Sequence, residues 1–165
     1  MQMGMAYTFQ ITASFPGLSV EENVALAVRR RVADIAEAKR AVRRALKRVG
    51  LDDRLDRVAG DLSYGHQRLL EIAMGVAQAP KLLILDEPTQ GLSDAEIEGF
   101  NALVAHLARE STVLLIEHNM GVVMEVAHRI TVLNMGEVLA EGTPEEIRAN
   151  DAVQAAYLGT ENAGA

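Results

Sequence analysis

The sequence predicts an α/β protein with a helical first half, a parallel sheet covered by helices, and a C-terminal hairpin followed by helices. Apolar runs at 82–86 and 112–117 are typical of buried strands, and a helical pattern follows each of them. The first half instead carries repeated helix start signals. The strand–helix–strand–helix–strand order favours a parallel sheet whose third strand is residues 130–134.

The helical first half follows from local capping patterns. Residues 1–18 are predicted to be irregular or partly extended. Ser19-Val20-Glu21-Glu22 has capping-box spacing, which predicts a helix running toward Arg31. Asp34-Ile35-Ala36-Glu37 repeats the signal, and Gly50 ends that second helix. Its predicted apolar face carries Ile35, Val42, Leu46 and Val49. After a linker, a third helix is expected from about Ser63 to Gln78.

The second half alternates strands and helices. Lys81 to Asp86 predicts a strand, and Ser93-Asp94-Ala95-Glu96 caps a helix that reaches Arg109. A second strand at 112–117 precedes a helix from about Met120 to Ala127. Runs at 130–134 and 137–141 flank Met135-Gly136, which predicts a hairpin. Thr143-Pro144-Glu145-Glu146 combines a cap, an early Pro and a reciprocal Glu, so another helix begins there.

Composition sets bounds on the class of protein. The 165 residues suffice for one domain, with 49% hydrophobic and 24% charged residues. The chain has no cysteine, which excludes disulfides and Cys-ligated metals. No apolar run approaches the roughly 18 residues that span a bilayer, and the first residues lack a signal-peptide pattern. We therefore expect a cytoplasmic protein that meets a membrane only through a partner.

The net charge of -7 is unevenly distributed. Residues 29–57 hold 11 Lys/Arg and 5 Asp/Glu, whereas the rest of the chain is strongly acidic. A solvated helix face explains the basic segment better than nucleic-acid binding, because no aromatic side chain interleaves the arginines for base stacking. We expect no nucleic-acid partner.

Two segments carry the candidate chemistry. Asp86 and Glu87 stand at the carboxyl end of a predicted parallel strand, where one carboxylate can hold Mg²⁺ through water and the other can activate a water. The two carboxylates can have different roles, since successive strand residues point to opposite faces of a sheet. Ser63-Tyr64-Gly65-His66-Gln67 opens a helix, whose N-terminal amides suit an anion. The plain alternatives are a strand end before a Pro turn and a simple Ser63 N-cap.

The order and spacing of these segments resemble the ATP-binding subunits of ABC transporters. Leu62 to Arg68 is similar to the signature motif, with Tyr64 and His66 as departures from it; Asp86-Glu87-Pro88-Thr89 and Ile116-Glu117-His118-Asn119 are similar to the acidic strand and switch segments. The resemblance implies an incomplete P-loop NTPase fold of the ABC ATPase type. It covers nearly all 165 residues as one partial domain, with helical, sheet and C-terminal parts at about 19–80, 81–142 and 143–165.

The resemblance also implies residue roles, with ATP and Mg²⁺ as cofactors. Asp86 orients Mg²⁺, Glu87 is the general base, and His118 contacts the γ-phosphate. The segment Ser63, Tyr64, Gly65, His66 and Gln67 contacts the ATP of a second ATP-binding subunit. Gln10 resembles the Q-loop glutamine, which touches Mg²⁺ and the lytic water. Permease subunits that span the membrane would hold the chain on the inner face of the plasma membrane.

Two further segments bear on the resemblance. Gln90-Gly91-Leu92-Ser93 occupies the D-loop position, with Ser93 where Asp is usual. The tail, His128 to Ile147 and then Asp151 to Gly159, resembles the C-terminal extension of importers for branched-chain amino acids and urea. An ordinary amphipathic helix is the plain alternative for this tail.

A lysine loop of the form Gly-x-x-x-x-Gly-Lys-[Ser/Thr] is not found in the sequence, because none of Lys39, Lys47 and Lys81 follows a glycine. The leading interpretation is therefore a truncated importer ATPase that does not turn over ATP alone. A non-enzymatic interaction module that docks on a transporter is the second. A DNA-repair or chromosome ATPase is a distant third, since sustained heptads are absent from the sequence.

Overall fold

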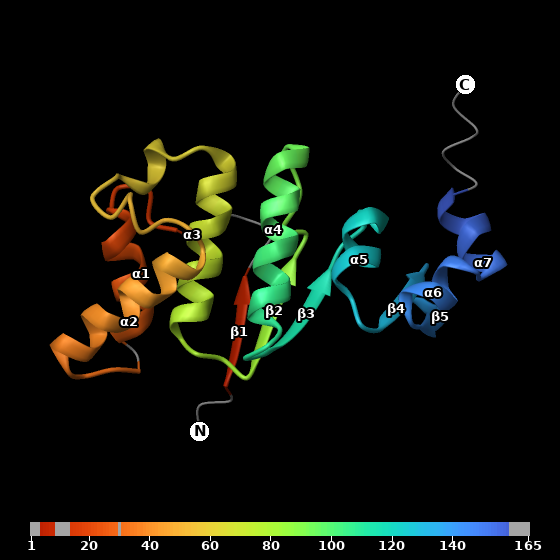
Figure 1. The fold of residues 1–165 in the computed structure, drawn as a ribbon, viewed down its shortest axis with the longest axis horizontal. Helices are drawn as coiled ribbons and strands as arrows, with labels where there is room; N and C mark the ends of the chain where they lie inside the picture. Colours follow the sequence, from red (N-terminus) through yellow and green to blue (C-terminus); the bar gives the residue numbers. More distant parts are fainter. Residues whose placement is uncertain (1–3, 9–13, 30, 159–165) are drawn as a thin grey trace. The chain divides into compact units, whose positions relative to one another are not determined.

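The computed structural model describes residues 4–8, 14–29 and 31–158, which belong to two compact units. Unit 1 comprises Met1–Glu117 and unit 2 comprises His118–Ala165. Unit 1 combines a helical layer with a parallel sheet, and unit 2 is built on a hairpin with short helices (Figure 1). Gln10, a predicted site residue, lies outside the described residues.

Three helices form the helical layer of unit 1: α1 (Val20–Arg29), α2 (Ile35–Arg48) and α3 (Tyr64–Ala77). The predicted caps start each of them. Ser19 and Glu22 exchange the two bonds of a capping box, and the Asp34 carboxylate accepts from the backbone N–H of Glu37. A short 3₁₀ helix, η1 (Ala59–Asp61), precedes α3. The three helices pack on one another through fully buried aliphatic residues, among them Val24, Leu46 and Leu70.

The predicted apolar face of α2 is wrong at one position. Val42, Leu46 and Val49 are buried as expected, but Ile35 is 77% exposed. Its spacing places Ile35 on the same face of the helix. A face becomes buried only where a neighbouring element covers it, and the first turn of α2 extends past such cover.

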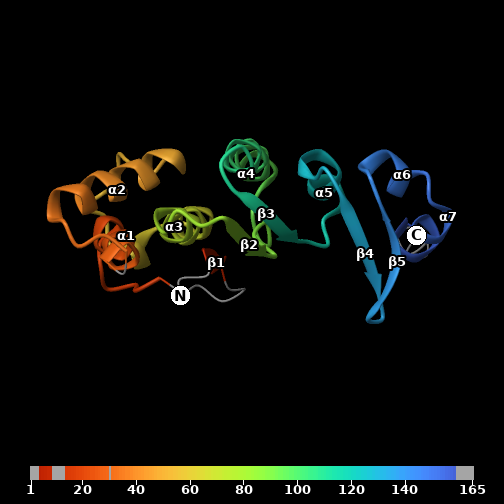
Figure 2. The ribbon, with the colours of Figure 1, turned by 90° about the horizontal axis from the view of Figure 1, so that it is seen from below.

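The sheet of unit 1 consists of β1 (Met5–Thr8), β2 (Leu82–Asp86) and β3 (Thr112–Ile116), all parallel and in the order β1-β2-β3. Ala6 pairs with Leu83, and Leu83 with Val113. The helix α4 (Asp94–Leu107) joins β2 to β3 and lies along the sheet in both views (Figures 1 and 2). This confirms the predicted strand–helix–strand unit.

The third parallel strand was predicted wrongly. Residues 130–134 do form a strand, but it belongs to a separate two-stranded sheet. The third parallel strand is β1, within a segment that we expected to be irregular or partly extended. Four residues are too few for a periodic pattern that would predict a strand. In the sequence, the helices α1, α2 and α3 lie between β1 and its partner β2, so local patterns do not predict the pairing.

The two faces of the parallel sheet differ in exposure. One face carries Ala6, Leu83 and Leu85, which are buried, whereas the other carries Met5, Tyr7, Leu114 and Ile116, which are 42 to 49% exposed. Alternation along each strand accounts for this division. Parallel sheets normally have both faces covered, so the exposed apolar face is unusual for the described part of unit 1.

Unit 2 is a hairpin packed by helices. It contains α5 (Met120–Val126), β4 (Ile130–Asn134), β5 (Glu137–Gly142), α6 (Pro144–Arg148), α7 (Asp151–Val153) and a π-helical turn, η2 (Gln154–Leu158). The strands β4 and β5 are antiparallel, which confirms the predicted hairpin. Its core is formed by Ile130, Val132, Ile147 and Val153. The Tyr157 hydroxyl donates to the carbonyl of Leu133 at 2.8 Å and ties the last turn to β4.

None of the helices in the described part of the chain is both long and apolar enough to cross a membrane.

Candidate active site

Asp86 is the last residue of β2 and lies on the exposed face of the parallel sheet. Its carboxylate oxygen Oδ2 accepts a hydrogen bond of 2.6 Å from the Tyr7 hydroxyl of β1. This bond raises the pKa of Tyr7, with smaller contributions from desolvation and from the Asp86 charge. Sequence analysis missed Tyr7, because only the β1–β2 pairing brings it to the acidic strand end.

Glu87 stands just beyond the strand, in a turn. Its φ is +44°, a left-handed conformation that is uncommon for a residue with a side chain. The backbone N–H of Glu87 donates to the carbonyl of Ile116 at 2.9 Å, and the Glu87 carbonyl accepts from Gln90 at 3.3 Å. Glu87 therefore occupies a turn after the strand, so strand alternation, on which the expected division of roles depended, does not apply to it. Strained backbone of this kind clusters at functional sites.

Glu117 connects the end of β3 to this turn. Its Oε1 atom accepts from the backbone N–H of Thr89 at 3.0 Å and from the Thr89 hydroxyl through a short bond. Thr89 is only 6% exposed, so the bonds are shielded from water. Sequence analysis included both residues in motifs without a role for them. The structure uses them to hold the 87–92 turn against β3.

The predicted phosphate-binding segment begins α3, and its polar groups are partly used within the chain. Ser63 is the N-cap: its Oγ accepts from the backbone N–H of His66 and lies 2.8 Å from the His66 Nδ1. The Gln67 amide donates to the carbonyl of Leu62 at 3.1 Å. These bonds shape the start of α3, and Tyr64 is left 43% exposed at its first position.

The Tyr64 ring contacts the buried ion pair of Arg68 and Glu71. The guanidinium of Arg68 lies 5.5 Å from the centre of the Tyr64 ring and pairs with Glu71 at 2.9 Å. Arg68 and Glu71 are both nearly fully buried. A buried charge needs a partner, and Glu71 supplies it while the ring covers the cation.

The missing side chain of Gly65 leaves room for a carboxylate of the same unit. A Cβ atom at Gly65 would lie 2.1 Å from Oε1 of Glu96, which belongs to the first turn of α4. Glu96 completes a capping box with Ser93, accepting from its N–H at 2.9 Å and its hydroxyl at 2.7 Å. These bonds lower the pKa of Glu96. Gly65, which the resemblance places in the segment that contacts ATP, packs against a carboxylate side chain of the same unit.

A second glycine contact joins the same two segments. Gly91 has φ +77°, and a Cβ there would lie 3.1 Å from the Tyr64 ring. The start of α3 therefore packs on the turn that follows Asp86 and Glu87. The sequence alone does not show that the signature-like segment and the acidic strand end lie on one surface of unit 1.

His118 is the first residue of unit 2 and is described with that unit. It precedes Asn119, the N-cap of α5, whose carboxamide oxygen accepts from the N–H of Val122 at 3.3 Å.

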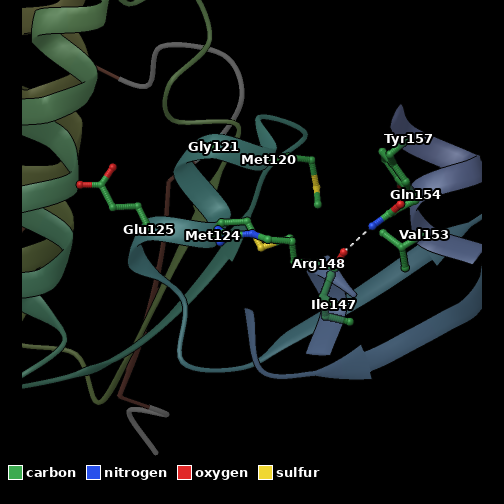
Figure 3. Close-up of a pocket in the computed structure, with 9 residues that line it drawn as sticks. All are labelled: Met120, Gly121, Met124, Glu125, Ile147, Arg148, Val153, Gln154 and Tyr157. Atoms are coloured by element: carbon green, nitrogen blue, oxygen red, sulfur yellow. Dashed lines mark hydrogen bonds between the residues drawn. The ribbon is translucent and has the colours of Figure 1, made fainter. Parts of the chain in front are cut away.

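One cavity in each unit can be compared with the predicted site. A cavity of about 410 Å³ between α3 and α4 is lined by Gly65, His66 and Glu96 together with apolar residues such as Phe100. In unit 2, a pocket of about 320 Å³ is lined mostly by apolar groups of α5, α6 and the last turns; the Gln154 amide donates there to the carbonyl of Arg148 at 2.7 Å (Figure 3). None of the predicted site residues lines this second pocket.

A site for Mg²⁺ and ATP needs oxygen ligands for the metal and donors for the phosphates. No group of three or more His, Asp and Glu residues in the described ranges could hold a metal alone. Mg²⁺ with a nucleotide needs only one or two protein carboxylates, because phosphates and waters supply the other oxygens. Asp86 and Glu87 fit that requirement. The lysine loop that cradles phosphates is not found in these 165 residues.

Comparisons with known proteins agree with the motifs. Residues 1–90 match the family model described as ABC transporter, and residues 137–163 match that of the branched-chain amino acid ATP-binding cassette transporter. Two similar proteins are the high-affinity branched-chain amino acid transport ATP-binding proteins LivG of Salmonella typhimurium and BraF of Pseudomonas aeruginosa. Each is 40% identical; the matches cover 96% and 94% of this chain and 69% and 68% of those proteins.

A solved structure supports the fold. CbiO1 of Clostridium perfringens, part of the ABC transporter complex cbiONQ, has a TM-score of 0.83 and 26% identity over 98% of this chain and 67% of its own. The chain thus spans about two thirds of the length of the proteins that it matches.

Proposed function

The chain belongs to the ABC transporter family, and from this premise we propose that it is part of the ATP-hydrolysing subunit of an importer for branched-chain amino acids. Family membership confirms the resemblance and the fold class predicted from the motifs. The proposed cargo is supported by the C-terminal match at residues 137–163 and by the names of LivG and BraF.

One observation carries the proposed chemistry: the start of α3 and the acidic end of β2 meet through the 87–96 segment of unit 1. Asp86 would hold the metal, and Glu87 would accept the proton of the attacking water. Bound Mg²⁺ supplies positive charge that offsets the charge developing on the phosphates. Ser63 and Gly65, with Tyr64, His66 and Gln67, would face the ATP of a second subunit.

Other roles rest on the family motifs alone. Gln10 would contact Mg²⁺ and the water, and His118 would contact the γ-phosphate. The proposed partners are a second ATP-binding subunit and membrane-spanning permease subunits, which would hold the chain on the inner face of the plasma membrane. The chain's helices offer no membrane span of their own in the described ranges. We expect no ATP turnover from these 165 residues in isolation, because they contain no lysine loop.

The test is Glu87→Gln in a complete subunit assembled with its permease. Removal of the general base should leave ATP binding intact and lower turnover by about 10²-fold or more. Single-turnover hydrolysis and nucleotide binding are measured on the same preparation. Glu98→Gln, an exposed carboxylate change on α4, is the matched control and should turn over normally. Turnover retained in Glu87→Gln would remove Glu87 from this role.

A non-enzymatic docking module is the second candidate, favoured by the missing lysine loop. It predicts co-purification with a transporter whose ATPase rate does not change when Glu87 of this chain is replaced.

A further inference from the structure

The outward side of α2 gathers positive charge in an otherwise acidic chain. We call this surface the basic side of α2; it consists of Lys39, Arg40, Arg43, Arg44 and Lys47, all exposed. These positions recur at helical spacing and share one side of the helix. The opposite side packs in the helical layer through Ala41, Val42, Ala45 and Leu46. Figure 2 shows α2 at the edge of that layer, away from the parallel sheet.

Ion pairs neutralise only part of this charge. The Glu37 carboxylate accepts from Arg40 at 2.8 Å and from Arg44 at 2.7 Å, which lowers the pKa of Glu37. Within the described ranges, no carboxylate lies within ion-pair distance of Lys39, Arg43 or Lys47. The basic side of α2 therefore keeps a net positive charge that the fold does not use internally.

We propose that the basic side of α2 contacts anionic phospholipid headgroups of the membrane. The proposal rests on the proposed function, because a permease would hold the chain close to that membrane. Exposed Lys and Arg gain from the negative potential of such a surface without needing a shaped site.

Charge and composition favour a membrane over a nucleic acid. Sequence-tolerant binding of single strands uses aromatic side chains between basic ones, and α2 contains no aromatic residue. The net charge of -7 also opposes general attraction of the whole chain to a polyanion. An anionic surface is therefore attracted to the chain only where it contacts the basic side of α2. A flat headgroup layer beside the complex is such a surface.

The experiment uses the purified 165-residue chain with two kinds of vesicle: phosphatidylcholine alone, and phosphatidylcholine with about a third phosphatidylglycerol. Co-sedimentation at low salt should show binding only to the anionic vesicles. High salt should weaken that binding, because screening shortens the reach of exposed charges. Binding to neither kind, or equally to both, would overturn the proposal.

A matched pair of variants locates the surface. Lys39→Gln, Arg43→Gln and Lys47→Gln together should weaken vesicle binding by about a hundredfold, since each basic residue near an anionic surface contributes about fivefold. Arg109→Gln, Arg129→Gln and Arg148→Gln together change the net charge equally at exposed positions outside α2, and should bind like the unaltered chain. Circular dichroism confirms that both variants are folded.

Two results would contradict the proposal: equal losses in the two triple variants, or an oligonucleotide that displaces the chain from vesicles at an equal concentration of phosphate. The second result would indicate a nucleic-acid surface. The assay contains neither ATP nor permease, so its failure leaves the Glu87 test untouched. Failure of the Glu87 test would likewise leave the measured vesicle binding unchanged.

Discussion

At the scale of single residues, Gly65 shows how a motif position can serve the fold. Its missing side chain makes room for the Glu96 carboxylate, which in turn caps α4 through Ser93. A glycine in this motif suggests close approach by a ligand, and the structure supplies a neighbour from the same chain. Both uses are compatible only if Glu96 and a phosphate meet different sides of the backbone.

Gly65→Ala should lower the free energy of unfolding by about 1 kcal/mol, because the new methyl group displaces the end of the Glu96 side chain and breaks its capping bonds to Ser93. Gly99→Ala is the matched control: the site is exposed in α4 with nothing within 4 Å, so Ala should stabilise by up to about 1 kcal/mol. Urea unfolding measures both. Gly65→Ala should destabilise the chain less when Glu96 is already replaced by Ala. An equal loss of stability in both backgrounds would show that the contact with Glu96 is not the cause.

The Tyr7–Asp86 bond is a second effect at residue scale. The bond holds the proton on Tyr7, so the folded-state pKa lies above the ordinary value of 10.0. Its contribution to stability is present below the unfolded-state pKa and is lost as pH rises through the raised folded-state value. Asp86→Asn should lower the pKa of Tyr7 toward 10.0.

Ring resonances of Tyr7, followed by NMR between pH 8 and 12, provide the measurement. The unaltered chain, titrated under the same conditions, is the reference for the variant. An unchanged Tyr7 titration in Asp86→Asn would show that the bond does not form in solution.

At the scale of elements, the hairpin of unit 2 has a methionine, Met135, at a turn position with positive φ. Asn134 pairs with Glu137, so Met135 and Gly136 form a two-residue loop with φ +49° and +85°. Positive φ at both positions is the geometry of a type I′ turn, in which Asn-Gly is preferred. Met135 is 99% exposed, and its side chain therefore contributes little packing.

Met135→Asn should stabilise the chain by roughly 0.5–1 kcal/mol, because Asn tolerates the left-handed conformation better than Met. Met135→Val, whose branched side chain resists positive φ, should destabilise it by about 1 kcal/mol or more. Thermal unfolding of the two variants tests the turn. The opposite order of melting temperatures would exclude the type I′ geometry.

At the scale of the whole molecule, the exposed face of the parallel sheet departs from ordinary packing in the described part of the chain. Met5, Tyr7, Leu114 and Ile116 lie on it, although parallel sheets are normally covered on both faces. Exposed apolar patches mark sites of association. The chain spans 69% of the length of LivG, and that relative therefore has further sequence from which cover can come.

The purified chain should self-associate at micromolar concentration through this face. Leu114→Thr with Ile116→Thr should reduce association, since Thr keeps the strand preference and removes apolar area. Leu133→Thr, at a position 56% exposed on the hairpin, is the control and should not change it. Sedimentation velocity distinguishes the species. A monomer at every concentration would contradict the prediction.

The sequence by itself determined the starts of most helices, the strands β2 to β5 and the family. Caps at Ser19, Asp34, Ser63 and Thr143 begin helices where predicted, because a capping bond joins residues only three apart. The ordered motifs also sufficed for the family, which the comparisons confirm. Both kinds of information are local, so no knowledge of the tertiary fold was required.

Only the tertiary structure decided the long-range partners. It joined β1 to β2, assigned residues 130–134 to a separate hairpin, and brought Glu96 to Gly65 and Tyr7 to Asp86. Glu96 follows Gly65 by 31 residues, and Asp86 follows Tyr7 by 79. Hydrophobic pattern and capping act over a few residues, whereas strand partners and packed side chains depend on how whole elements meet.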